Sequence, residues 1–357
     1  MKPEAVSPPP PELSLPYEQI HQMVAAEFTV EEGFIEYNTP TFYVTQKPDV
    51  KQAFARLFKK MNSKQLLPVL RKRESRIVLQ VVSKPPVKTS NPLINIVLLL
   101  ATIGTTMFTG YLLSGEATDP LVGAVLFSTA LMSILGAHEM GHKLTANKHG
   151  VEATYPYFIP GFPPFGTFGA VIQQKSLAPN RDALFDLGFS GPMIGFLLAV
   201  AVSIIGIPMS NIRVVQELPV GIIQPPILLD FLANYLLKFE PVSTGYVLIE
   251  LHPVAFAGYI GMIVTMLNLM PIGQLDGGHV AQVLLGDTAR AAVSVIAIVS
   301  LLFIAWPMAL IAYLLSRVRH PDALDAVSTV SRTRKFASIA LIVVFVLSVA
   351  PVAPLFF

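Results

Sequence analysis

The sequence predicts a polytopic α-helical membrane protein with about six transmembrane helices, a small soluble α+β N-terminal domain and a β-element embedded in the membrane. Hydrophobic residues make up 53% of the chain and charged residues only 13%, whereas soluble domains carry about 25% charged residues. The chain also contains six long uncharged segments, and most reach the length of about 20 residues that crosses a bilayer. They span residues 93–113, 121–137, 187–210, 251–275, 291–316 and 336–357.

Residues 1–91 are expected to form the soluble domain. The stretch 41–45 is a predicted strand, and Asp49 is placed to cap a helix whose apolar residues recur at helical spacing. Two further strands are predicted at 66–70 and 77–82, around a polar turn. Thirteen of the 25 lysines and arginines precede the first span, against nine acidic residues. This excess of basic residues predicts a cytoplasmic N-terminus.

Residues 92–290 are expected to form the membrane core, and residues 291–357 to add C-terminal transmembrane segments. With a cytoplasmic N-terminus, alternation of the spans returns the end of the second span to the cytoplasmic side. The same count places the basic loop 317–335 outside, against the tendency of basic loops to stay inside. A hairpin that turns back near Trp306 would remove this conflict, although the segment is short for two full crossings. The sequence leaves the topology after Asp276 open.

The second apolar segment runs into an HExxH motif, in which His138 is followed by Glu139 and, four residues on, by His142. Residues four apart share one face of a helix, so both imidazoles can reach one zinc ion. The glutamate between them can act as the general base for the attacking water. Ionisable groups within a membrane are costly and mark functional sites. The alternative is a pair of buried histidines hydrogen-bonded within the bundle.

A catalytic zinc site keeps three protein ligands and an open fourth position. The chain has no cysteine, so the ligands must be His, Asp or Glu. Asp276 is the candidate third ligand, because it ends another apolar segment that alternation places at the same face of the membrane. An ordinary helix-end aspartate before two glycines is the alternative. His279 is a candidate to support the ligands, and Asp287 and His279 are the next candidates if Asp276 is not the third ligand.

Asn268 is a polar residue in an apolar stretch, about two helical turns before Asp276. Its amide can donate a hydrogen bond to a substrate carbonyl or to a developing oxyanion. An interhelical hydrogen bond is the alternative role. Pro271 breaks the intervening helix and frees backbone carbonyls near the site.

The connection that follows the HExxH motif, residues 155–172, carries no charge. Non-helical backbone at membrane depth is tolerated only where protein buries it or where it lines a cavity. An exposed strand there can hold an unwound substrate by β-augmentation, and a hydrophobic cap over the helices is the alternative. The predicted substrate-binding strand consists of Gly166, Thr167, Phe168, Gly169, Ala170, Val171 and Ile172.

Taken together, these motifs resemble those of the site-2 protease family of intramembrane zinc metalloproteases. The resemblance covers roughly residues 92–290 and rests on two separated motifs: the HExxH at the end of a second span, and the Asn…Pro…Leu-Asp-Gly-Gly stretch that contains Asp276. It implies that His138, His142 and Asp276 bind zinc and that Glu139 is the catalytic base. The C-terminal part is similar to the plant chloroplast branch of that family.

The predicted function is that of an intramembrane zinc endopeptidase, with Zn²⁺ as its cofactor, that cleaves transmembrane segments near the cytoplasmic face. The process is regulated intramembrane proteolysis, in a multi-pass protein of the cell membrane. The expected partners are a transmembrane protein substrate and the lipid bilayer, with no nucleic acid; the sequence does not give the oligomeric state. A non-proteolytic zinc-binding scaffold or transporter is the alternative, although metal binding alone does not require Glu139, and transporters tend to carry internal repeats.

Overall fold

The computed structural model describes residues 15–45, 49–86, 91–114, 118–217, 224–237, 245–304, 309–310, 313–314, 316–317 and 322–350. The chain divides into two compact units. The first comprises Met1–Lys88, Ser176–Leu184 and Pro321–Val330, and the second Thr89–Lys175, Phe185–His320 and Ser331–Phe357. Two short segments from far along the chain therefore belong to the N-terminal unit.

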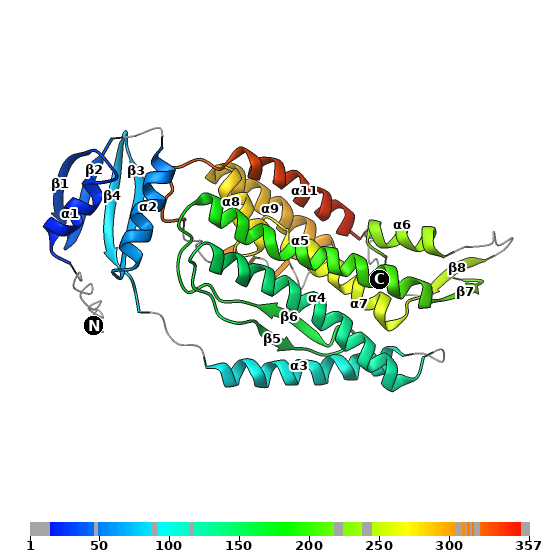
Figure 1. Ribbon diagram of the computed structural model, residues 1–357. Coiled ribbons are helices and arrows are strands. Elements are labelled where there is room, and N and C mark those ends of the chain that lie inside the picture. The colour runs from blue at the N-terminus through cyan, green and yellow to red at the C-terminus, as the bar shows by residue number, and fades with distance from the viewer. Residues whose placement is uncertain are drawn as a thin grey trace, which may run out of the picture. The chain divides into compact units, whose positions relative to one another are not determined.

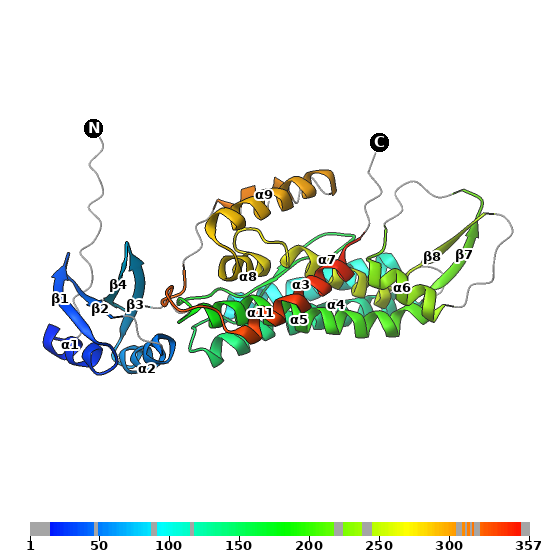
Figure 2. The same cartoon turned by 90° about the horizontal axis from the view of Figure 1, so that it is seen from above.

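The first unit contains a four-stranded antiparallel sheet in the order β1-β2-β4-β3, with both of its helices on one face (Figures 1 and 2). The side chains of Phe42, Phe54 and Leu79 are fully buried between sheet and helices. The predicted strands and the helix after Asp49 are confirmed, whereas the first helix and first strand were not predicted. The elements are α1 Tyr17–Ala25, β1 Val30–Glu36, β2 Thr39–Val44, α2 Val50–Asn62, β3 Leu66–Arg73 and β4 Arg76–Ser83.

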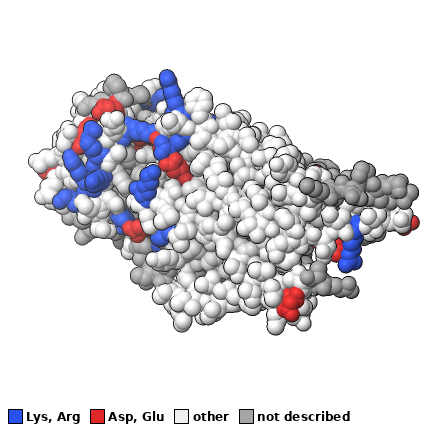
Figure 3. All heavy atoms as spheres, turned by 45° about the vertical axis from the view of Figure 1, so that its right-hand side comes forward, with Lys and Arg blue, Asp and Glu red and all other residues white. Residues whose placement is uncertain are grey.

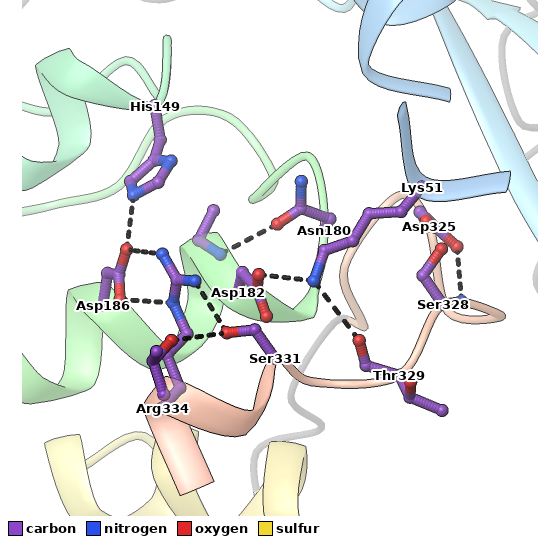
Figure 4. A network of polar contacts seen from close by, with 12 residues as sticks. Lys51, His149, Asn180, Asp182, Asp186, Asp325, Ser328, Thr329, Ser331 and Arg334 are labelled. Atoms are coloured by element: carbon purple, nitrogen blue, oxygen red, sulfur yellow. Dashed lines mark hydrogen bonds and ion pairs between the residues drawn. The ribbon is translucent and has the colours of Figure 1, made fainter. Parts of the chain in front are cut away.

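The late segments of the chain complete the N-terminal unit in two ways. The backbone N–H of Leu70, on the edge strand β3, donates to the carbonyl of Leu324 at 2.8 Å. The Leu324 side chain is buried in the core of this unit. In addition, the Lys51 ammonium forms an ion pair with Asp182 and donates to the carbonyl of Thr329 (Figure 4). The sheet, its hydrophobic core and its surface charges are thus all tied to residues 176–184 and 321–330.

The second unit is mainly helical and contains two separate hairpins of two strands each (Figure 1). One hairpin pairs β5 with β6, and the other pairs β7 with β8. The elements are α3 Pro92–Leu113, α4 Pro120–Lys148, β5 Tyr157–Pro160, β6 Thr167–Val171, α5 Arg181–Gly206, η1 Ile207–Met209, β7 Asn211–Val215, α6 Ile227–Leu236, β8 Tyr246–Glu250, α7 Pro253–Asn268, α8 Asp276–Leu284, α9 Asp287–Ile304 and α11 Arg332–Ser348.

Three helices of the described chain are long and apolar enough to cross a membrane, namely Pro92–Leu113, Pro120–Lys148 and Arg181–Met209. The helix of the second segment continues through the HExxH motif, as predicted. The predicted count of six spans is not confirmed, because α7 has only 16 residues and α11 has 17. The predicted strand at 166–172 is confirmed, since β6 occupies its centre.

The fifth apolar segment is not one continuous span. Helix α9 runs to Ile304, yet Ser316 and Arg317 line the same cavity as Arg290 and Ser294 from the beginning of α9. The chain must therefore fold back between these positions. This agrees with the hairpin interpretation; Trp306 itself, where the turn was predicted, lies outside the described residues.

Large apolar side chains cover much of the outside of the second unit. On α3, for example, Leu93, Leu100 and Phe108 are each more than half exposed. Figure 3 shows a broad surface without charged residues, whereas charged side chains gather on the N-terminal unit. Such a surface suits contact with lipid rather than with water.

Small residues let α5 and α7 pack closely in the second unit. A Cβ on Gly258 would lie 2.2 Å from the hydroxyl oxygen of Ser203, and one on Gly261 would lie 2.8 Å from the Cβ of Ala199. Helices in membranes commonly associate through such small residues. This close packing fixes α7, which ends at Asn268, against the helix that borders the HExxH histidines.

Candidate metal centre

The two histidines of the HExxH motif lie one turn apart on α4 with their rings side by side. The ring centroids are 4.8 Å apart, and the two Nε2 atoms are separated by 3.1 Å. Both side chains are almost completely buried, with 4% of the His138 surface and 6% of the His142 surface exposed. The helical spacing thus places two potential ligand nitrogens at one point, as the sequence predicts.

Asp276 meets these nitrogens from another part of the chain. It is the first residue of α8, and its Oδ2 atom lies 3.3 Å from the Nε2 atoms of both His138 and His142. The three donor atoms form a nearly equilateral triangle. Two ligands of a tetrahedral zinc ion, at about 2.0–2.1 Å from the metal, lie about 3.3 Å from each other. The residues present therefore fit zinc in both chemistry and spacing.

His142 is held in the orientation that metal binding requires. Its Nδ1 atom lies 2.8 Å from the backbone carbonyl oxygen of Leu187 on α5. A proton on Nδ1 satisfies that carbonyl and leaves Nε2 free as an electron-pair donor. Second partners of this kind fix the tautomer and the ring plane of metal-binding histidines.

Glycines on α5 make room for both imidazole rings. A Cβ on Gly191 would lie 2.1 Å from Nε2 of His142, and one on Gly195 would lie 3.0 Å from Nδ1 of His138. Gly188, one turn before Gly191, similarly allows close approach to the backbone carbonyl of Asp276. These positions recur at helical spacing, so one face of α5 contacts the whole ligand set. The role of this face was not predicted from the sequence.

Glu139 lies beside the triangle on α4 and is also buried, with 6% of its surface exposed. Its Oε1 atom is 3.9 Å from Nε2 of His138, farther than Asp276 Oδ2 is from the same atom. Glu139, His138 and His142 could by themselves hold a metal, since their ligand atoms lie within 4.8 Å of one another. The tighter triangle with Asp276 makes the aspartate the better third ligand and leaves Glu139 next to the metal position.

The backbone N–H of Ile172 faces the Glu139 carboxylate. Ile172 directly follows β6, so the predicted substrate strand ends at the predicted catalytic base. The remaining members of that strand do not all share one environment: Phe168 is 63% exposed and Thr167 only 8% exposed. The Thr167 hydroxyl donates to the carbonyl of Ile159 and so ties β6 to β5.

Asn268 is brought to the site, whereas His279 and Asp287 are not among the converging ligand atoms of the described residues. The Asn268 amide nitrogen lies 3.4 Å from Nε2 of His138. The Asp287 carboxylate is fully exposed, and the Cβ of His279 abuts Gly188. This contact joins α7 to α4 and corresponds to the interhelical hydrogen bond that the sequence left as the alternative, so a role of the amide toward substrate stays a prediction.

Two glycines explain why the chain can turn sharply before α8. A Cβ on Gly277 would lie 2.0 Å from the carbonyl oxygen of Leu269, and one on Gly278 would lie 2.2 Å from that of Gly273. Any larger residue would push α8 away from the loop that precedes it. The Leu-Asp-Gly-Gly sequence therefore positions Asp276 through close backbone packing.

A cluster of charged residues fixes the ends of three helices near the site. Asp186 on α5 accepts hydrogen bonds from Arg334 on α11, at 2.7 Å from Nε and 2.6 Å from Nη2 (Figure 4). His149, which caps α4 seven residues after His142, lies with Nε2 2.9 Å from Asp186 Oδ2. No sequence pattern predicted this cluster, because its members are far apart in the chain.

Comparison with known proteins places the chain in a family. Residues 126–310 match the sequence profile of Peptidase family M50. The chain is 32% identical over 179 residues to "Probable zinc metalloprotease EGY1, chloroplastic" of Arabidopsis thaliana, which covers 49% of this chain and 32% of that protein. The corresponding protein of Oryza sativa subsp. japonica is 34% identical over 156 residues, covering 43% and 26% of the two chains.

"Probable zinc metallopeptidase EGY3, chloroplastic" of Arabidopsis thaliana is 32% identical over 217 residues, or 56% of this chain and 37% of that protein. The chain thus spans about a third of the length of the curated relatives it matches. No solved structure gives a significant match. The family and the relatives' names agree with the predicted enzyme class and with zinc as the predicted metal.

Proposed function

This chain belongs to peptidase family M50, and from that premise we propose that it is an intramembrane zinc endopeptidase which cleaves transmembrane segments of other proteins near the cytoplasmic face. The observation that carries the proposal is the triangle formed by His138, His142 and Asp276, with Glu139 beside it. All four residues converge among apolar helices. A scaffold or a transporter could use the three ligands but has no need for the adjacent carboxylate.

We assign the chemistry as follows. His138, His142 and Asp276 would hold zinc, which when bound supplies Lewis acidity toward a carbonyl and toward water. Glu139 takes the proton of the attacking water and delivers it to the leaving amine as the peptide bond breaks. The N–H of Ile172 holds the Glu139 carboxylate in place. The Asn268 amide donates to the scissile carbonyl oxygen as negative charge develops there.

The free edge of β6 is the proposed site for the unwound substrate. Gln173 faces Thr154: its carbonyl accepts from the Thr154 N–H, and its own N–H donates to the Thr154 hydroxyl. Neighbouring residues of a strand direct their backbone groups to opposite edges. Ile172 accordingly directs its N–H away from β5, toward Glu139.

The same alternation continues backwards along β6. Ala170 pairs with Phe158 in register, but its backbone N–H and C=O point to the open edge, while those of Val171 face Tyr157. Phe168 is the extra residue where the register shifts between Ile159 and Pro160, so the alternation is not carried past Gly169. A substrate strand hydrogen-bonded to Ala170 would therefore lead its next peptide bonds toward Glu139. The N–H of Ile172 is already used and takes no part in this pairing.

We infer the sidedness of the membrane core from the composition of the N-terminal unit. Residues 1–88, 176–184 and 321–330 form one compact body, so all three must lie on the same side of the membrane. In the proposed topology, the chain leaves that side in α3 and returns to it in α4. It leaves again in α5 and returns in α7. The hairpin 287–317 begins and ends on that side, and α11 is the last crossing. The basic composition of residues 1–91 supports a cytoplasmic location for this side.

The depth of the site follows from the length of α4. The helix has 29 residues, and His138 lies 18 residues after its start, or about 27 Å along the axis. With Pro120 at the far boundary of a hydrocarbon layer of about 30 Å, His138 lies close to the cytoplasmic boundary. Water can reach that depth more easily than the centre of the bilayer, which a hydrolase requires.

The test uses the full-length protein in liposomes with a panel of single-span substrates. Wild-type protein should cut a substrate within its apolar segment, and Glu139→Ala should abolish the cut while zinc content stays unchanged. The matched control is Met140→Ala, because Met140 is the neighbouring residue and is 39% exposed. Cleavage that persists in Glu139→Ala, or a variant that binds no zinc, contradicts the assigned role. Zinc binding by wild-type protein without any cleavage favours the scaffold.

A further inference from the structure

A cavity of about 560 Å³ that contains charged side chains lies between the loop that precedes α8 and the hairpin that begins with α9. Its lining combines backbone from the loop with side chains from both ends of the hairpin. The lining includes Pro271, Gly273, Asp287, Arg290, Ser294, Ser316 and Arg317. None of them was assigned a role in hydrolysis.

Two guanidinium groups dominate the charge of this cavity. Among the residues that the structure describes, Arg290 pairs with Asp287 alone, through a long contact of 3.5 Å between Nη2 and Oδ1, and the Asp287 carboxylate is fully exposed to solvent. Arg317 lies over the ring of Tyr313, 5.7 Å from its centroid. Within the described part of the chain, Arg317 has no carboxylate partner. Each guanidinium therefore retains donors for a further anionic group.

The hydroxyl groups of the cavity are already engaged. Ser294 donates to the backbone carbonyl of Pro271, and Ser316 donates to that of Tyr313 at 2.7 Å. The hydroxyl oxygens and the exposed Asp287 carboxylate, which also lines the cavity, remain acceptors. The donors left for a ligand belong to the two guanidinium groups, which bind a carboxylate, often through two parallel hydrogen bonds.

The position of the cavity relates it to the substrate rather than to bulk lipid. One wall is formed by Pro271 and Gly273, in the loop that leads directly into Asp276. In the proposed topology, a chain that leaves the metal centre toward the cytoplasm would pass beside this wall. The hairpin also returns to the same side at which α9 begins, so both arginines lie where a membrane-spanning substrate meets water.

We propose that Arg290 and Arg317 bind an acidic side chain of the substrate, in the stretch that joins its transmembrane segment to the cytoplasm. The enzyme then prefers substrates with Glu or Asp at this junction over substrates with neutral or basic residues. The inference rests on the proposed function, because it concerns what the same site selects. An anionic lipid headgroup is the competing occupant of the cavity.

Binding is measured first, so that the result does not depend on cleavage. The full-length Glu139→Gln protein in liposomes of neutral lipid is titrated with two fluorescent single-span peptides that differ only by Glu or Gln at the cytoplasmic junction. The Glu peptide should bind about fivefold more tightly, as expected for a partly exposed ion pair. Adding Arg290→Gln and Arg317→Gln should remove the difference and leave the Gln peptide unchanged.

Two further arms make the result specific. Arg213→Gln is the matched control, since Arg213 pairs with Glu250 on the β7–β8 hairpin and should have no influence on the preference. Replacing both cavity arginines by Glu should reverse the preference toward a peptide with Lys at the junction, and this gain also shows that the variant is folded. Cleavage by otherwise wild-type protein is then compared on the same peptides.

Equal binding of the Glu and Gln peptides to the protein with both arginines overturns the proposal, whether or not any peptide is cut. A preference that survives both Arg→Gln substitutions overturns it as well, because the selecting group is then elsewhere. A requirement for the two arginines that emerges only in vesicles with anionic lipid assigns the cavity to a headgroup instead. If no peptide is cleaved but the Glu peptide still binds more tightly, the result contradicts the proposed hydrolysis. It does not contradict the binding of an acidic substrate residue by Arg290 and Arg317.

Discussion

Gly191 of α5 leaves the space into which the imidazole of His142 extends: a Cβ on this glycine would lie 2.1 Å from Nε2. The same nitrogen is 3.3 Å from Asp276 Oδ2. The third helix of the core thus sets the position of a proposed metal ligand without supplying one. The absence of a side chain at residue 191 is as necessary for the geometry as the presence of the histidine.

Gly191→Ala should therefore lower both zinc content and peptide hydrolysis. The added methyl group must displace either the His142 ring or α5, and overpacking of this kind costs about 1–3 kcal/mol. We expect at least about a tenfold loss of activity. Gly104→Ala is the matched control, because nothing lies within 4 Å of a Cβ at Gly104 on α3. Normal zinc content and normal activity in Gly191→Ala would show that the packing can relax and that the glycine is dispensable.

Asp276→Ala should weaken zinc binding, because it removes one of three converging donors and leaves two imidazoles. Even residues that only support a ligand change metal affinity by about 10–100-fold, so the loss of a ligand should cost at least as much. Metal content and affinity are measured on purified full-length protein, with His279→Ala as the comparison. Should Asp276→Ala retain full affinity while Glu139→Ala loses it, the third ligand is Glu139.

The sequence was sufficient to predict that the proposed metal ligands converge, because the geometry of the two histidines is local. His138 and His142 share a helical face wherever α4 lies, and the chain contains few other polar residues at the ends of apolar segments. Asp276 followed from the need for a third ligand at the same membrane face. Its 3.3 Å separation from both histidines depends on the turn before α8, which only the structure provides.

Features that depend on distant packing could not be predicted. The sequence does not indicate which residues the glycines of α5 contact. The apolar stretch 291–316 has the composition of a span, so the sequence offered a hairpin there only as one way to remove the conflict over the basic loop; the cavity that Arg290 and Arg317 share supports the fold-back. Strand β1 lacks alternation, because its residues are mostly exposed, and so its composition gave no strand signal.

Ala170→Pro should impair cleavage and leave zinc content unchanged. Proline removes the N–H that we assign to the open edge of β6, while the pairing of Val171 with Tyr157 is preserved. Ala170→Gly, which keeps the N–H, is the control and should retain activity. The measurement is the rate of cleavage of one substrate together with bound zinc. Equal rates for the proline and glycine variants would mean that no substrate strand pairs at Ala170 and that the hairpin only covers the helices.

Leu324→Ala should destabilise the N-terminal unit without changing the metal centre. Its side chain is 1% exposed in the core of that unit, and truncation of a buried leucine costs about 2–5 kcal/mol. The cost falls on the unit formed by residues 1–88, 176–184 and 321–330. The proposed zinc ligands lie in the other unit, so zinc content should stay the same.

Hydrogen exchange of amides in β3 and β4 reports the stability of the N-terminal unit. Thr329→Ala is the control, because Lys51 contacts only the backbone carbonyl at that position. Cleavage of several substrates is measured on the same samples. If exchange accelerates while rates and substrate choice stay the same, the N-terminal unit has no part in selecting substrates; if exchange is unchanged, Leu324 does not contribute to the core of that unit.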